Sequence, residues 1–160
     1  MDLEIVPAYS YKEEINTLFT EYTNMLSEKE PSFQKYLEIQ HYNEELEDLE
    51  MKYGLPDGRL YLAYYQKKLA GCIGLRRLDY KNCEMKRLYV RPNFRGKQIG
   101  SQLVHQVITD AKGIGYTYML LDTLPFLKSA VRIYQEVGFY EIPCYNESPS
   151  DDTIFMRLDL

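Results

Sequence analysis

The sequence predicts an α/β fold of the α+β kind, in which a mixed, mostly antiparallel sheet of about six to seven strands is flanked by four helices. Two observations carry this prediction. Strand-like runs at 59–65, 69–75 and 84–90 are joined by short polar turns, as in an antiparallel meander. A helical segment at 98–112 then precedes a strand-like run at 118–121, and a helical crossover of this kind makes the two strands that it joins parallel.

The first part of the chain adds one strand and two helices. Residues 3–6 alternate weakly in hydropathy, as a short strand does. Ser10 precedes Glu13 at the spacing of a capping box, and apolar residues then recur at helical intervals through 11–28. A second helical stretch covers 33–54, and its polar middle predicts a kink or a loose segment.

The last part of the chain adds one helix and two strands. Apolar spacing predicts a helix over 126–137, and Gly138 supplies its end. Runs at 139–142 and 153–158 have strand character and are separated by residues typical of turns. The chain therefore closes on a helix followed by two strands.

Size and composition restrict the classes of function. The 160 residues, 45% of them hydrophobic, match one domain with a buried core, so we expect a single domain over 1–160. A net charge of −5 argues against nucleic acid or an anionic membrane as a partner and favours a cationic one such as an amine. The cysteines show no zinc-site spacing and no membrane-spanning or signal segment is evident, so we expect a cytoplasmic protein without a metal.

The loop between the strand at 84–90 and the helix at 98–112 has the composition of an anion site. It follows Pro92 and is rich in arginine, glycine and lysine. Its backbone N–H groups lie where a helix begins, so unpaired donors and the positive end of the helix dipole meet there. The sequence therefore predicts a phosphate-binding loop made of Arg95, Gly96, Lys97, Gln98, Ile99, Gly100 and Ser101.

This loop resembles the signature of the GNAT superfamily of acyl-CoA-dependent N-acetyltransferases, which is Arg or Gln, two variable residues, Gly, one variable residue, then Gly or Ala. The signature falls on Arg95 to Gly100, with Gln98 in place of the middle glycine. A second family segment, Ala-x-x-x-Tyr-x-x-x-Gly-Phe, falls on Ala130, Tyr134, Gly138 and Phe139. The similarity covers roughly residues 59 to 142. It implies a GNAT-like sheet whose central parallel strands are splayed apart.

The resemblance also implies a chemistry. It predicts transfer of an acetyl group from acetyl-CoA to a primary amine, on a small molecule or a peptide, by direct attack in a ternary complex. The loop Arg95–Ser101 would hold the pyrophosphate of the cofactor, and the backbone of Leu88, Tyr89 and Val90 would bind its pantetheine arm as an added strand. The resemblance leaves a homodimer open.

Two residues are candidates for catalysis. Tyr134 matches the family tyrosine that lies near the thioester sulfur, and a tyrosine of ordinary pKa near 10 can protonate the departing thiolate. Glu84 matches the position that some members use for the base. Regular strand alternation would place Glu84, Lys86, Leu88 and Val90 on one face, towards the cleft.

Structural alternatives remain for both candidates. Glu84 would also serve as a strand carboxylate paired with Lys86 or Arg77, and Tyr134 would also serve as core packing against Leu103 or Val107. Direct attack is preferred to an acyl-enzyme because no histidine neighbours Cys72 or Cys83 in sequence.

The acceptor and one rival function stay open. A non-catalytic acyl-CoA-binding module, acting as a sensor or by binding a partner, is the alternative to an enzyme. The tyrosines of the helical stretches at 11–28 and 33–54, together with Tyr61, Tyr64 and Tyr65, are candidates for lining the pocket of an amine through cation–π contacts or hydroxyl groups, or for ordinary packing.

Overall fold

The computed structural model describes residues 2–39, 42–146 and 152–160. In these ranges the chain forms one seven-stranded sheet with the strand order β1-β2-β3-β4-β5-β7-β6. The strands are β1 (Leu3–Pro7), β2 (Arg59–Tyr65), β3 (Lys68–Arg77), β4 (Asn82–Val90), β5 (Tyr118–Thr123), β6 (Tyr140–Ile142) and β7 (Ile154–Asp159). The helices are α1 (Lys12–Lys29), α2 (Phe33–Ile39), α3 (Tyr42–Glu47), α4 (Leu49–Tyr53), α5 (Ile99–Ile114) and α6 (Lys128–Val137), with a 3₁₀ turn, η1, at Pro92–Phe94.

The predicted pairing is confirmed. Strands β2, β3 and β4 form an antiparallel meander, and β4 pairs with β5 in parallel across the α5 crossover. The pairs β1–β2, β5–β7 and β6–β7 are antiparallel. The sheet is therefore mixed and mostly antiparallel, with its parallel pair near the centre.

The N-terminal helices differ from the prediction in two details. The residue before α1 is Tyr11, no side chain caps that helix end, and the predicted capping box at Ser10 is wrong. The helical stretch expected over 33–54 is divided into α2, α3 and α4, and residues 40–41 lie outside the described ranges. Asp48 explains one division, because its side chain accepts a hydrogen bond from the Met51 N–H and thereby starts α4 anew.

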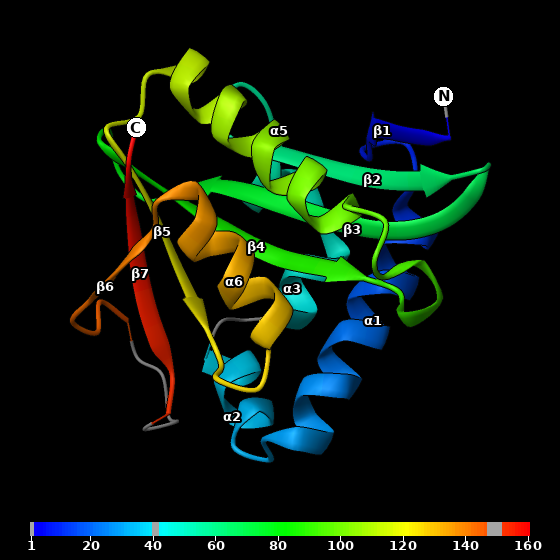
Figure 1. Ribbon diagram of the computed structural model, residues 1–160, viewed down its shortest axis with the longest axis horizontal. Coiled ribbons are helices and arrows are strands. Elements are labelled where there is room, and N and C mark those ends of the chain that lie inside the picture. The colour runs from blue at the N-terminus through cyan, green and yellow to red at the C-terminus, as the bar shows by residue number, and fades with distance from the viewer. Residues whose placement is uncertain (1, 40–41, 147–151) are drawn as a thin grey trace.

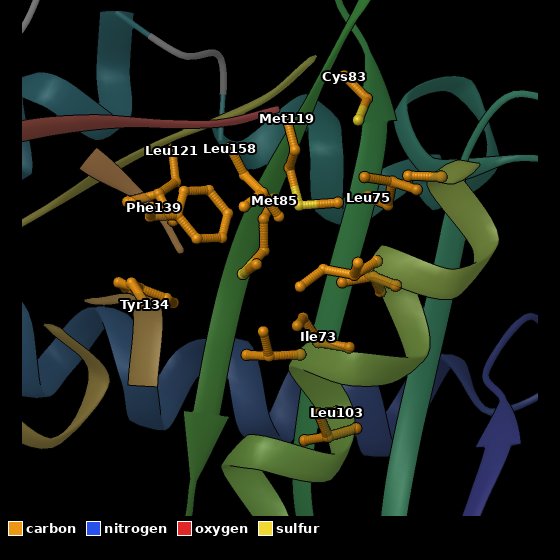
Figure 2. Close-up of a cluster of buried hydrophobic side chains, with 14 of the residues drawn as sticks. Ile73, Leu75, Cys83, Met85, Leu103, Met119, Leu121, Tyr134, Phe139 and Leu158 are labelled. Carbon is orange, nitrogen blue, oxygen red and sulfur yellow. The ribbon is translucent and has the colours of Figure 1, made fainter. Parts of the chain in front are cut away.

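Helices cover both faces of the sheet (Figure 1). Helices α5 and α6 lie on one face, where Leu103, Val107 and Tyr134 join a large apolar core. Helix α1 lies on the other face and packs Leu18 and Phe19 against the sheet. Figure 2 shows part of the first core, with Tyr134 beside Phe139. The site described below lies where these two layers meet the sheet between β4 and β5.

The parallel pair comes apart along its length. Its register pairs Asn82 with Tyr118, Cys83 with Met119 and Glu84 with Leu120, and it ends there within the described residues. Beyond this point β4 continues to Val90 and β5 to Thr123. The second half of β4 therefore has a pairing partner in β3 only, and the predicted splay is present.

A β-bulge at Arg87 changes which side chains of β4 share a face. Arg87 has a φ of 60°, and the register with β3 passes from Cys72 opposite Tyr89 to Gly74 opposite Lys86, so that two residues of β4 stand against one of β3. As a result Leu88 and Val90 lie on the α5 face together with Cys83 and Met85. The prediction that Glu84, Lys86, Leu88 and Val90 share one face is wrong, because regular alternation stops at this bulge.

A buried ion pair holds the bulge in place. The Arg87 guanidinium donates to both carboxylate oxygens of Glu45 on α3, from Nε to Oε2 and from Nη2 to Oε1, each at 2.9 Å. Lys52 Nζ donates to Glu45 Oε1 at 2.6 Å and the Tyr53 hydroxyl donates to Oε2 at 3.0 Å. Both Glu45 and Arg87 are 5% exposed. The Tyr42 ring lies against the guanidinium, 5.3 Å from its centroid.

The pKa of Glu45 shows how strongly this pair is coupled. Burial by itself raises the pKa of this carboxyl group, but the charges and hydrogen bonds of Arg87 and Lys52 outweigh burial and lower the pKa to about 2. Because the folded pKa lies below the unfolded value of 4.5, the ionised carboxylate stabilises the fold above pH 4.5. This stabilisation is lost as the pH falls towards 2.

We predict that Glu45→Gln lowers the free energy of unfolding by about 3 to 5 kcal/mol at pH 7, because Arg87 is left buried without its counter-ion. The difference from the wild type should shrink as the pH is lowered from 4.5 towards 2. Urea unfolding at several pH values measures both effects. Glu47→Gln, on the exposed side of α3, is the matched control and should change stability little. An equal loss in both variants would contradict the role given to Glu45.

Candidate active site

A cavity opens where β4 and β5 separate. Its walls include Tyr22 and Leu26 of α1, Lys86 and Arg87 of β4, Asp122 and Thr123 of β5, Leu127 just before α6, and Tyr134 of α6. Apolar and ionisable side chains thus line the same space, which suits a site that orients a small polar group. The splayed strands place this space between the two helical layers.

Tyr134 enters the cavity from α6. The residue is 6% exposed, its ring packs edge-to-face on Phe139 with centroids 5.7 Å apart, and it belongs to the core that contains Leu103 and Val107. Burial raises the pKa of its hydroxyl well above the usual value, and nearby Tyr22 and Asp122 act in the same direction. Tyr134 therefore keeps its proton at neutral pH. The Tyr134 side chain therefore packs in the apolar core and also lines the cavity.

The free side of β4 presents backbone groups to the splay. The Arg91 N–H donates to the carbonyl of Ala70 in β3. Because the backbone N–H and C=O groups of successive strand residues point to opposite sides of the strand, those of Leu88 and Val90 point away from β3. The Tyr89 carbonyl points towards β3, since its oxygen lies 2.6 Å from the place that a Cβ on Gly71 would take. The Tyr89 hydroxyl donates to Glu21 Oε1 at 3.2 Å. Leu88 and Val90, but not Tyr89, therefore offer backbone groups to a ligand between the strands.

The predicted phosphate loop leads directly into α5. Gly96 has a φ of 82° and Gln98, the residue before the helix, has a φ of 65°. No side chain in the described ranges caps this helix end, and Arg95 to Gln98 are exposed. The N–H groups of the first helical turn thus remain accessible to an anion. The loop lies at the same end of β4 as Val90, whose carbonyl accepts from Arg95 Nε at 3.3 Å.

Sequence comparisons agree with this geometry. A family model described as the acetyltransferase (GNAT) family matches residues 17–139. The chain belongs to the GNAT acetyltransferase family. An uncharacterized N-acetyltransferase of Dictyostelium discoideum is 32% identical over an alignment of 222 positions that covers 100% of both chains. Another, from Schizosaccharomyces pombe, is 38% identical over 126 residues that cover 78% of this chain and 77% of the relative.

Solved structures of GNAT proteins share the fold. An acetyltransferase from Streptococcus agalactiae has a TM-score of 0.77 at 21% identity and covers 100% of this chain and 99% of its own. A GNAT acetyltransferase from Staphylococcus aureus has a TM-score of 0.75 at 26% identity, with 98% of each chain covered. A GNAT structure from Elizabethkingia anophelis contains acetyl-CoA and has a TM-score of 0.56 at 27% identity, covering 65% of this chain and 77% of its own.

The departure from the GNAT signature at Gln98 has a structural cost. The backbone there adopts the left-handed conformation that glycine reaches without penalty, and the glutamine side chain is exposed. Gly100, in contrast, needs to be small, because a Cβ there would lie 3.2 Å from Ile133 Cδ1 and 3.7 Å from Val90 Cγ2. Gly100 therefore lets the start of α5 approach both β4 and α6.

Glu84 is placed differently from what the resemblance suggested for a base. Its residue is 4% exposed and is absent from the cavity walls formed by the described residues. Its carboxylate lies 3.1 Å from Arg76 Nε and 3.7 Å from Lys86 Nζ, and it accepts from the Tyr145 hydroxyl at 2.6 Å. Arg77, the alternative partner, instead lies 3.5 Å from Asp57.

Three of the tyrosines proposed for the acceptor pocket, Tyr61, Tyr64 and Tyr65, are absent from the cavity walls formed by the described residues. The Tyr61 hydroxyl donates to Asp110 on α5, Tyr64 packs against Tyr11, and Tyr65 packs against Phe94. Tyr22, a tyrosine of the first helix, and Lys86, which was expected to face the cleft, do line the cavity. The sequence reasoning missed Asp122 and gave Lys86 no role. A usable signal was the charged run from Glu84 to Arg87 inside a central strand, where charges are seldom found without a partner.

The structure also bears on metal ions and membranes. Among residues 2–39, 42–146 and 152–160, no group of three or more His, Cys, Asp or Glu side chains is arranged to hold a metal ion. In the same ranges, no helix combines the length and the hydropathy that crossing a bilayer requires.

We predict that Gln98→Gly raises the free energy of unfolding by about 0.5 to 1 kcal/mol, because removing the left-handed strain outweighs the added entropy of the unfolded chain. Gln102→Gly, at an exposed site in the first part of α5, should instead lower it by about 1 kcal/mol. Chemical denaturation of the two variants measures the contrast. Destabilisation of both to the same degree would show that the backbone of Gln98 carries no strain.

Proposed function

We propose that this acetyltransferase transfers an acetyl group from acetyl-CoA to a primary amine by direct attack in a ternary complex. One observation carries the proposal: the half of β4 that has no pairing with β5 runs from the cavity that holds Tyr134 towards the open helix start of α5. A diphosphate, an extended arm and a thioester would lie along β4 in that order. The acetyl-CoA in the Elizabethkingia anophelis relative supports the choice of donor.

The loop and the free half of β4 would bind the cofactor. The N–H groups of Arg95 to Ser101 would surround the pyrophosphate at the positive end of α5, with Arg95 and Lys97 adding charge. Lys97 Nζ already lies over the Tyr65 ring, 5.1 Å from its centroid, and this contact holds the lysine beside the loop. The pantetheine arm would pair with the backbone of Leu88 and Val90 as an added strand.

Tyr134 would act as the general acid. When the amine attacks the thioester, the new C–N bond forms and the C–S bond breaks, leaving a thiolate. Tyr134 would give this thiolate its proton, since its raised pKa keeps the hydroxyl protonated at neutral pH. The burial that raises this pKa also excludes water from the reacting thioester.

The cysteines support direct attack over an acyl-enzyme. Cys72 and Cys83 are buried, and burial raises the pKa of both thiols, that of Cys83 to about 12. A thiol with such a pKa is a poor nucleophile at neutral pH. In the part of the chain that the structure describes, neither cysteine lines the cavity.

Glu84 is proposed to position neighbouring charges more than to remove a proton. Its carboxylate already forms an ion pair with Arg76, accepts a hydrogen bond from the Tyr145 hydroxyl and lies beside Lys86. A base must reach the amine directly or through one water. Asp122 lines the cavity from β5, where its Oδ2 accepts from Asn146 Nδ2 at 2.7 Å. Unlike Glu84, it borders the space that an acceptor would fill, and it would accept the proton of the acceptor.

The direct test is thiol release from acetyl-CoA in the presence of a broad panel of amines. The proposal expects release that depends on both the enzyme and the amine and that yields the N-acetylated product. Calorimetric titration with CoA runs beside the assay. Saturable CoA binding without thiol release for any amine would favour the non-catalytic acyl-CoA-binding module, and the absence of CoA binding would overturn both functions.

We predict that Tyr134→Phe lowers kcat by about 100-fold, in the range that loss of a general acid produces, and changes the affinity for acetyl-CoA little. Steady-state kinetics with calorimetric binding separate the two quantities. Tyr80→Phe, at a residue that is 75% exposed, is the control for loss of a tyrosine hydroxyl. An unchanged kcat in Tyr134→Phe would remove this residue from the mechanism.

A further inference from the structure

The cavity contains the buried Lys86 ammonium group, which has no hydrogen-bond acceptor among the residues that the structure describes. The side chain of Lys86 is 5% exposed and lines the cavity from β4. Within the described residues its one ionic contact is Glu84 Oε1, at 3.7 Å, which is longer than a hydrogen bond. A lysine that is desolvated to this degree normally has a close anionic partner. The missing partner is therefore expected from a ligand.

Glu84 does not neutralise Lys86, because it is shared. Its Oε1 lies closer to Arg76 Nε, at 3.1 Å, and its Oε2 accepts from the Tyr145 hydroxyl at 2.6 Å. Two basic side chains thus face one carboxylate, so one of them has no acidic counterpart of its own in this cluster. In such a low-dielectric position this unmatched basic group favours an anion in the cavity.

The opposite wall of the cavity has the opposite charge. Lys86 lies two residues beyond Glu84 on β4, and Asp122 lies two residues beyond Leu120 on β5. Glu84 and Leu120 are the last pair before the strands separate. Lys86 and Asp122 therefore occupy corresponding positions on the two sides of the splay, and both line the cavity. A cation on one strand faces an anion on the other across the space that an acceptor would fill.

We propose that the acceptor is a small amine that also carries a carboxylate, that is, an amino acid or a close analogue. The Lys86 ammonium binds the acceptor carboxylate, and Asp122 binds the acceptor ammonium and takes its proton. The free amine then attacks the thioester carbon, the C–S bond breaks, and the thiolate leaves with the proton of Tyr134. The second proton of the amine nitrogen passes to the Tyr134 oxygen and restores its hydroxyl. This inference rests on the proposed acetyl transfer and specifies its substrate class.

The test compares matched acceptors. Each of several amino acids is assayed with its carboxamide and with its decarboxylated amine, by thiol release from acetyl-CoA. The wild type should show a kcat/KM at least about tenfold higher for the carboxylate, since a charged hydrogen bond is lost in the other two compounds. In Lys86→Gln this ratio should fall to about one, mainly through a higher KM for the carboxylate, and Lys86→Arg should restore part of it.

A binding readout makes the test independent of turnover. With CoA present, N-acetylated amino acids and their carboxamides are titrated calorimetrically into the wild type and Lys86→Gln. The wild type should prefer the acid, and the variant should lose this preference while binding CoA as before, which also shows that it folds. If no acceptor gives thiol release but the wild type still prefers the acid, the proposed acetyl transfer is wrong and the carboxylate site remains supported.

Three results would overturn the proposal. Carboxamides used as well as amino acids by the wild type would mean that no carboxylate is recognised. An equal fall of kcat for every acceptor in Lys86→Gln would place the lysine at the reacting carbonyl oxygen instead. Equal binding of acid and carboxamide products by the wild type would exclude the site without reference to rate.

Discussion

The geometry of the site depends on the backbone of Arg87. Its positive φ inserts an extra residue into β4, so that the strand changes the face to which successive side chains point. Before the bulge, Glu84 and Lys86 point away from the core under α5; after it, Leu88 and Val90 pack against that core. A strained backbone of this kind persists only where the surroundings hold it. The buried ion pair between Arg87 and Glu45 stabilises this backbone conformation, and it also fixes the short helix α3 against the sheet.

Most of the fold could be predicted from the sequence, because the period of the hydrophobic residues and the positions of turn residues determine helices, strands and turns locally. The meander from β2 to β4, the α5 crossover and the helix before Gly138 all follow from spacing. The division of the segment after α1 did not follow, since Asp48 and the docking of Glu45 on Arg87 decide it, and the second of these is a long-range contact. Such contacts leave no periodic mark in the sequence.

The cofactor side of the site was more predictable than the acceptor side. The loop before α5 can be predicted from its glycine and basic residues next to a helix start, and Tyr134 can be predicted from its sequence spacing to Gly138. Lys86 and Asp122 carry no such signature. They become neighbours of one cavity only because β4 and β5 part after Glu84 and Leu120. The assignment of Glu84 as a base rested on the position that some GNAT members use, and only its expected orientation rested on regular alternation, which the bulge interrupts.

The unpaired half of β4 has a consequence for the dynamics of the protein. The amides of Leu88 and Val90 lie in the middle of the chain's central sheet, yet they lack a neighbouring strand on one side. Amides in this position exchange with solvent through local fluctuations and not only through global unfolding. A cofactor arm that pairs with them would serve as the absent strand segment. Substrate loading and completion of the sheet would then be one event, recorded by slower deuterium uptake at these two positions.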